Sequence, residues 1–136
     1  MAFYPYLFFG GNCREAFTRY TEIFGGELTL IAMKDMPSPE PVKPEHADLI
    51  MHAALKLGDD LLMASDDPTE NFGTVHGMQV NFSVAEPVEA KRVFDALADG
   101  GQVNLPIGET SWSPMFGMCV DRFGTPWMVS ADPPAT

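Results

Sequence analysis

Hydrophobic and polar positions follow the same order of patterns in each half of the chain. The first half opens with a continuous apolar run over residues 3–9, which is typical of a buried strand. Apolar residues then recur at helical spacing from Ala16 to Phe24, and Gly25-Gly26 ends this predicted helix. Three further strands are predicted, over residues 27–34, 48–57 and 61–65. The first half is therefore expected to have the order βαβββ.

The second half repeats this order. A strand is predicted over residues 78–84, and Pro87 suits the first turn of the helix that follows it. Gly100-Gly101 ends that helix. The remaining strands are predicted over residues 102–107, 116–121 and 127–131. Helices on one face of each sheet would leave the other face free to curve around a cavity.

Short sequence matches indicate that the two halves are an internal repeat. Glu15-Ala16 matches Glu89-Ala90 at an offset of 74 residues. Two similar modules closing on each other would leave a natural ligand site between them. We predict an α+β fold in which two tandem βαβββ modules form a curved mixed sheet around a cavity. The predicted organisation is a single domain, 1–136, with module one at about 1–66, a linker at 67–76 and module two at about 77–136.

Two details of the first half concern polar side chains. Asn12 and Glu15 have the spacing of a capping box, in which the two side chains satisfy backbone N–H groups at the start of a helix. Asp66 and Asp67 are interpreted as turn residues.

The range 35–46 holds four prolines and is expected to be an exposed loop.

Composition narrows the possible partners. The chain has 136 residues, of which 46% are hydrophobic, enough for one core. A net charge of −11 argues against nucleic acid, since phosphate binding relies on Lys and Arg. No apolar run approaches the length of a membrane span, and no signal segment is evident, so no membrane partner is expected. Cys13 and Cys119 form no metal or redox motif, which favours the cytoplasm.

The order of several motifs resembles the vicinal oxygen chelate superfamily, which includes glyoxalase I, extradiol dioxygenases and bleomycin-resistance proteins. Within it the chain is most similar to the PhnB-like branch, and the similarity covers nearly the whole chain. The residues that carry it are Tyr4–Phe9 with Gly11-Asn12, Leu62–Asp66, Trp112, Phe116-Gly117 and Asp121–Met128. The resemblance implies a two-module cup and a homodimer.

Metal-dependent members of this superfamily place His, Gln or Glu ligands on the first, fourth, fifth and eighth strands. The resemblance and the internal repeat together put these positions at Pro5, Leu62, Gln79 and Met128. Only Gln79 could donate to a metal that prefers nitrogen and oxygen ligands. We therefore predict no cofactor and no ordinary metal centre. An atypical divalent-metal site around Gln79, His52 and His76 is kept as an alternative.

Alternation along the fifth strand predicts which residues would meet a ligand. Its polar side chains, Gln79, Asn81 and Ser83, share the face that the superfamily turns inward, and on the first strand the corresponding face is predicted to be Pro5, Leu7 and Phe9. Aromatic and polarizable side chains would add surface for a flat or basic ligand. The predicted ligand-binding residues are Gln79, Asn81, Ser83, Trp112, Phe116, Trp127 and Met128.

Three functions fit these features. The first is a small-molecule binding protein, or an enzyme, that uses the cup without a metal. The second is a metal-dependent lyase, isomerase or dioxygenase of the glyoxalase type. The third is a structural or regulatory dimer with no catalytic role. Neither the ligand nor the presence of catalysis follows from the sequence.

Overall fold

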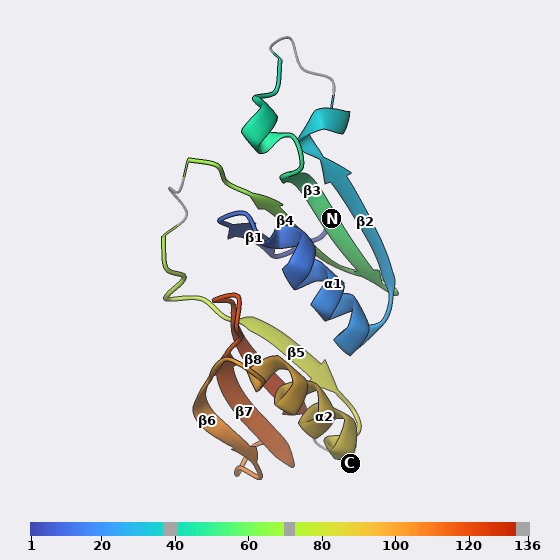
Figure 1. Ribbon diagram of the computed structural model, residues 1–136. Helices are drawn as coiled ribbons and strands as arrows, with labels where there is room; N and C mark the ends of the chain where they lie inside the picture. Colours follow the sequence, from blue (N-terminus) through green and yellow to red (C-terminus); the bar gives the residue numbers. More distant parts are fainter. Residues whose placement is uncertain (37–40, 70–72, 133–136) are drawn as a thin grey trace. The chain divides into compact units, whose positions relative to one another are not determined.

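The computed structural model describes residues 1–36, 41–69 and 73–132 (Figure 1). They form two compact units, which we call unit 1 (Met1–Gly73) and unit 2 (Thr74–Thr136). Each unit has a four-stranded mixed sheet and one long helix, so the βαβββ order predicted for each half is confirmed. Within the described ranges, no helix is long and apolar enough to cross a membrane.

Unit 1 carries its helix on one face of its sheet. The strand order is β1-β4-β3-β2, in which β1 runs parallel to β4 and the other neighbours are antiparallel. The elements are β1 (Tyr6–Phe9), α1 (Cys13–Phe24), β2 (Glu27–Ala32), β3 (Ile50–Leu57) and β4 (Asp60–Asp66). Two short 3₁₀ turns, η1 (Met33–Asp35) and η2 (Pro44–His46), occupy part of the loop that was expected over 35–46, and residues 37–40 of that loop lie outside the described residues.

Unit 2 has the same arrangement. The strand order is β5-β8-β7-β6, with β5 parallel to β8 and the other neighbours antiparallel. The elements are β5 (Val80–Val84), α2 (Pro87–Ala98), β6 (Gln102–Gly108), β7 (Met115–Val120) and β8 (Pro126–Ala131). The strand predicted from residue 78 therefore begins two residues later, at Val80. Residues 70–72 of the predicted linker are outside the described part of the chain.

Each helix buries one apolar stripe against its own sheet. On α1 the buried side chains are Cys13, Ala16, Phe17, Tyr20 and Ile23. On α2 they are Ala90, Val93, Phe94 and Leu97. In both helices these positions recur every three or four residues, the spacing that keeps side chains on one face of a helix. Among the residues that the structure describes, no helix of the same unit covers the opposite face of its sheet, and we call this face the open face of that unit.

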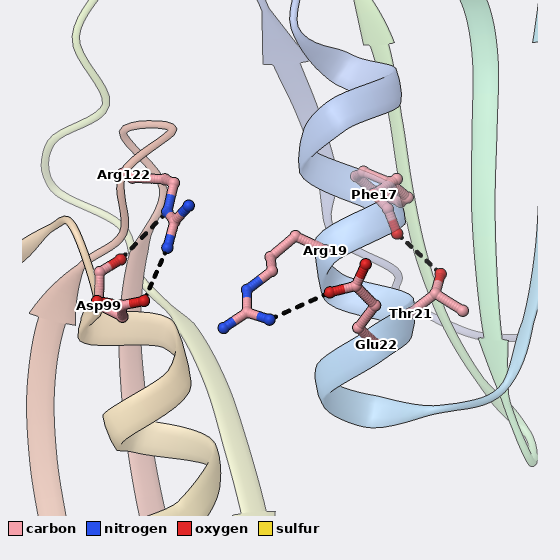
Figure 2. A network of polar contacts seen from close by, with 6 residues as sticks. All are labelled: Phe17, Arg19, Thr21, Glu22, Asp99 and Arg122. Carbon is pink, nitrogen blue, oxygen red and sulfur yellow. Dashed lines mark hydrogen bonds and ion pairs between the residues drawn. The ribbon is translucent and has the colours of Figure 1, made fainter.

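Polar contacts at the helix surfaces are mostly exposed (Figure 2). On α1, Arg19 pairs with Glu22 at 3.1 Å. In unit 2, Arg122 lies in the turn between β7 and β8, and Asp99 follows the last residue of α2. The Arg122 guanidinium donates to the Asp99 carboxylate at 3.0 Å and to the Asp99 backbone carbonyl oxygen at 3.2 Å. Because water screens such pairs, each is expected to contribute only about 0–1 kcal/mol to the free energy of unfolding.

A single buried carboxylate organises unit 1. Asp66, at the end of β4, is 4% exposed and accepts three backbone hydrogen bonds. One oxygen accepts from the N–H groups of Gly11 and Cys13, both at 3.0 Å, and the other accepts from Ile50 at 2.9 Å. The carboxylate therefore joins the first turn of α1 to β3 and β4, and its charge is favourable beside a helix N-terminus.

This contact replaces the capping box that the sequence predicted. Asn12 is the N-cap residue of α1, but its side chain makes no capping hydrogen bond. The N–H groups at the start of the helix are instead satisfied by a residue more than fifty positions away in the sequence. The interpretation of Asp66 as a turn residue was wrong for the same reason, since its role depends on the pairing of β1 with β4.

Replacing Asp66 with Ala is expected to lower the free energy of unfolding by about 3 kcal/mol, because two buried N–H groups and one part-buried N–H group lose a charged acceptor. Urea denaturation followed by circular dichroism would measure the change. Asp95→Ala, which removes an exposed carboxylate paired with Lys91 on α2, is the control and should change the value by about 0.5 kcal/mol or less. Equal effects of the two substitutions would contradict this role for Asp66.

Close packing between α2 and its sheet depends on one glycine. A Cβ atom added to Gly117 on β7 would lie 2.8 Å from Cε2 of Phe94 and 2.9 Å from Cα of Ile107. These distances are too short for a side chain, so only glycine allows the Phe94 ring to approach β7 this closely. The contact also shows that Gly117 faces α2, and this fixes which side of the sheet is open.

We expect Gly117→Ala to lower the free energy of unfolding by about 1–3 kcal/mol, the usual cost of overpacking a core. Gly108→Ala is a matched control, because a Cβ there meets nothing within 4 Å and the substitution should change stability by about 0.5 kcal/mol or less. Chemical denaturation of the two variants side by side would test the difference. A Gly117 variant as stable as the Gly108 variant would show that the sheet and helix can separate without cost.

Candidate functional site

Four of the seven predicted ligand-binding residues share the open face of unit 2. Asn81 pairs with Met128 across β5 and β8, and Ser83 pairs with Ser130. Ser130 in turn pairs with Phe116 on β7. Because paired residues point to the same side of a sheet, these side chains all lie opposite Gly117 and α2.

A row of hydrogen-bonding groups runs across this open face. The Ser83 and Ser130 hydroxyl oxygens are 2.9 Å apart, and either one can be the donor. Asn81 Nδ2 donates to the Ser83 hydroxyl at 3.5 Å, the long end of the range for a hydrogen bond. Asn81 and Ser83 are exposed and Ser130 is half-buried. The row keeps spare donor and acceptor capacity, because an amide and two hydroxyls have more sites than these contacts use.

An aromatic pair lies next to the polar row. Trp112, in the loop before β7, is 61% exposed, and its ring centroid is 5.5 Å from that of Phe116 in an edge-on arrangement. The loop is held by Thr110 and Ser113, since the Ser113 N–H donates to the Thr110 hydroxyl at 3.0 Å. An exposed indole held against a buried phenyl ring offers a flat apolar surface beside Ser130.

The other two predicted residues are placed differently. Gln79 is exposed and precedes β5, so it is not part of the paired sheet. Trp127 is 2% exposed and pairs with Val80 and Cys119, which puts it on the α2 side of the sheet. Its indole N–H donates to the buried Asp121 carboxylate at 2.8 Å. The structure thus brings Asn81, Ser83, Phe116, Met128 and Trp112 together and leaves Gln79 and Trp127 apart from them.

On the first strand the predicted inward face was wrong. Leu7 pairs with Ala64, and the Phe9 ring packs edge-on against Phe17 of α1 at 6.2 Å, so Leu7 and Phe9 face the helix. Pro5 precedes β1. The open face of unit 1 instead carries the intervening residues Tyr6 and Phe8.

A difference in loop length caused this error. The connection from β1 to α1 has three residues, Gly10–Asn12, whereas the connection from β5 to α2 has two, Ala85-Glu86. The offset of 74 that aligns the helices therefore becomes 75 on the strands, where Phe9 corresponds to Val84. In a strand a shift of one residue exchanges the two faces.

The same correction applies to β4. Asn81 pairs with Met128, and its counterpart Tyr6 pairs with Met63, so the counterpart of Met128 is Met63 and not Leu62. The open face of unit 1 also carries His52, whose Nδ1 lies 3.2 Å from the Tyr6 hydroxyl. A lone histidine such as His52 was expected to be a surface or hydrogen-bonded structural residue, with metal ligation kept as the alternative. Its approach to Tyr6 follows only from the strand order, in which β4 separates β3 from β1.

The donor chemistry does not fit the metal that the superfamily resemblance implies. With the corrected register, the four positions hold Tyr4, Met63, Gln79 and Met128, which are one phenol, one amide and two thioethers. Met63 and Met128 are poor ligands for a divalent metal that prefers nitrogen and oxygen. Among the residues that the structure describes, no group of three or more His, Cys, Asp or Glu side chains is placed to hold a metal ion.

Both cysteines are buried next to carboxylates. Burial, with a contribution from the Asp66 charge, raises the pKa of Cys13 to about 12. Burial and Asp121 raise the pKa of Cys119 to about 11. Because the thiolate is the reactive form, neither residue has the character of a nucleophile at neutral pH, even though Cys13 begins a helix.

The folded protein is therefore expected to show negligible reaction with a thiol-specific disulfide reagent at pH 8, where both thiols remain protonated. Both thiols should react after unfolding in guanidinium chloride, when their pKa values return to the ordinary range near 8.5. Absorbance of the released aromatic thiol would count the reacting groups. A native thiol that reacts as fast as free cysteine would contradict the burial of these residues.

Comparison with known proteins supports the fold and defines the family. Residues 1–130 match the family model described as 3-demethylubiquinone-9 3-methyltransferase. The chain is 31% identical over 135 residues to the protein YjdN of Escherichia coli strain K12, and the match covers 93% of this chain and 92% of YjdN.

Solved structures agree with this assignment. The protein PA1353 of Pseudomonas aeruginosa is 44% identical with a TM-score of 0.88, over 97% of this chain and 98% of that one. A PhnB protein of Bacillus cereus, named as a putative 3-demethylubiquinone-9 3-methyltransferase, is 24% identical with a TM-score of 0.76, over 96% and 99% of the two chains.

More distant structures share the fold alone. A glyoxalase/bleomycin resistance protein/dioxygenase family enzyme of Burkholderia phytofirmans is 15% identical with a TM-score of 0.62, over 94% of this chain and 95% of that one. The resemblance to the glyoxalase fold and to the PhnB-like branch is thus confirmed. The chain belongs to the 3-demethylubiquinone-9 3-methyltransferase family.

Proposed function

We propose that this protein binds a small molecule on the open face of unit 2, without a metal centre. The observation that carries the proposal is the meeting of a polar row with an aromatic pair on one sheet face. Asn81, Ser83 and Ser130 form the row, and Trp112 and Phe116 form the pair. Specific binding sites commonly combine apolar surface with a few fixed polar groups.

The chemistry of this face favours a flat ligand with a polar edge. The planar part would lie against the Trp112 and Phe116 rings, where contact with an exposed indole removes apolar surface from water. The polar edge would exchange hydrogen bonds with Asn81 and Ser83. The Met128 side chain, beside Asn81, is half-buried and flexible enough to adapt to the shape of the ligand.

Methyl transfer, which the family description names, is not part of this proposal. Methyl transfer from S-adenosylmethionine requires a cofactor site, and the chain contains no G-x-G-x-G loop of the kind that holds a nucleotide cofactor at the start of a helix. The sheets of both units are mixed and four-stranded, unlike the parallel sheets that carry such loops. Binding is the part of the function that the open face supports directly.

The proposal keeps the homodimer and the cytoplasmic location expected from the resemblance and the composition. Within the described residues, exposed large hydrophobic side chains gather at the start of the chain, at Met1, Phe3 and Tyr4. Exposed apolar residues gathered in one segment are typical of a surface that associates with another chain.

A thermal-shift screen over small metabolites and antibiotics is expected to find compounds that raise the melting temperature, with no dependence on added divalent metal. Asn81→Leu and Ser83→Ala should each weaken the binding of such a compound by about tenfold, the cost of one lost hydrogen bond to a ligand. Binding beside Trp112 is also expected to change the tryptophan fluorescence of the protein. Trp112→Phe should remove this ligand-induced change, because the other tryptophan, Trp127, is buried.

Asn104→Leu provides the control for the Asn81 variant. Asn104 is an exposed asparagine on β6, at the opposite edge of the same sheet, and its substitution should leave the affinity unchanged. Stabilisation that requires a metal, or equal losses from the Asn81 and Asn104 variants, would argue against this proposal.

A further inference from the structure

Three aromatic rings lie together on the open face of unit 1. The Tyr6 ring centroid is 5.3 Å from that of Phe8 and 5.8 Å from that of His52. Tyr6 and Phe8 come from β1 and His52 comes from β3, two strands that are separated in the sheet by β4. We call this cluster the aromatic shelf.

The shelf is not part of the core that α1 covers. Phe8 is 52% exposed and Tyr6 is 39% exposed, whereas Phe9, on the other side of β1, is 3% exposed and packs against α1. Strand positions that face water are normally polar, so two large exposed rings on alternate positions of one strand are unusual.

A hydrogen bond fixes the geometry of the shelf. The Tyr6 hydroxyl and Nδ1 of His52 are 3.2 Å apart, and the two ring planes are inclined by 32°. A ring that is already held in place loses little conformational entropy when a ligand binds, so the shelf is preorganised. The Tyr6 hydroxyl and the His52 imidazole are therefore polar groups at one end of the shelf, next to the apolar ring of Phe8.

Charge narrows the class of ligand. Unit 1 holds five of the chain's eight Lys and Arg residues but twelve of its nineteen Asp and Glu residues. On the open face itself the paired residues Lys56 and Glu27 carry opposite charges and offset each other locally. The field of the unit therefore favours a cation, and the faces of aromatic rings attract cations through their quadrupole.

We propose that the aromatic shelf of Tyr6, Phe8 and His52 is a binding site for a planar aromatic cation. The ligand ring lies on Tyr6 and Phe8, with its positive charge over the phenol face. The shelf uses none of the residues of the site proposed on unit 2. Neither proposal requires the other.

The test uses three probes of similar size and different charge at pH 8: 1-methylquinolinium as the cation, quinoline as the neutral ring and 2-naphthalenesulfonate as the anion. Titration would be followed through the imidazole proton signals in NMR spectra of the full chain, which has three histidines. We expect 1-methylquinolinium to shift the His52 signals and to bind at least fivefold more tightly than quinoline.

Variants locate the site. Tyr6→Leu and Phe8→Leu keep apolar bulk but remove a ring, and each should raise the Kd of 1-methylquinolinium by about two- to fivefold. Tyr6→Phe keeps the ring while losing the hydrogen bond to His52, so it should weaken binding less than Tyr6→Leu. Tyr4→Leu is the matched control, because Tyr4 is exposed but precedes β1, and it should leave the Kd unchanged.

Several results would overturn the proposal: no binding of the cation, binding of quinoline or 2-naphthalenesulfonate as tight as that of 1-methylquinolinium, or an equal loss in the Tyr4 variant. Both tryptophans lie in unit 2, so tryptophan fluorescence reports the other site separately. A failure on one unit can therefore be distinguished from a failure on the other.

Discussion

The buried carboxylate of Asp66 is the contact on which the arrangement of unit 1 depends. It accepts hydrogen bonds from the loop after β1, from the first residue of α1 and from the first residue of β3. An ionised group removed from water is stable only when its oxygens are satisfied, so these segments must come together. The contact holds α1 against one face of the sheet and leaves the other face open.

Unit 2 reaches the same arrangement without that carboxylate. Its counterpart of Asp66 is Ala131, and the end of β8 is held instead by the Ser113 hydroxyl, which donates to the Ala131 carbonyl oxygen at 2.6 Å. The two units thus share a scaffold but differ in the side chains on their open faces. Unit 1 presents Tyr6, Phe8 and His52, whereas unit 2 presents a polar row beside an indole and a phenyl ring. A repeated scaffold whose two open faces carry different side chains is suited to binding two different ligands.

Much of the fold and part of the candidate site could be predicted from the sequence. Period-two alternation correctly placed Asn81 and Ser83 on the face opposite α2, because β5 has a clear apolar side. The residues of β1 are apolar on both sides and give no alternation, so its face was transferred from β5 at the repeat offset of 74, and this transfer failed. Residue type could not separate Trp127 from Trp112, since Trp127 is buried by strand pairing that puts it on the α2 side of the sheet.

The sequence by itself determined the elements and their order, because helical spacing, strand alternation and glycine stops are local properties. The sequence also determined the net charge of the chain and the small number of histidines that could bind a metal, since both are matters of composition. Only the tertiary structure decided which side of β1 and of β4 is open. That choice depends on strand pairing and on a single extra residue in the loop between β1 and α1, and a shift of one residue reverses every side chain of a strand.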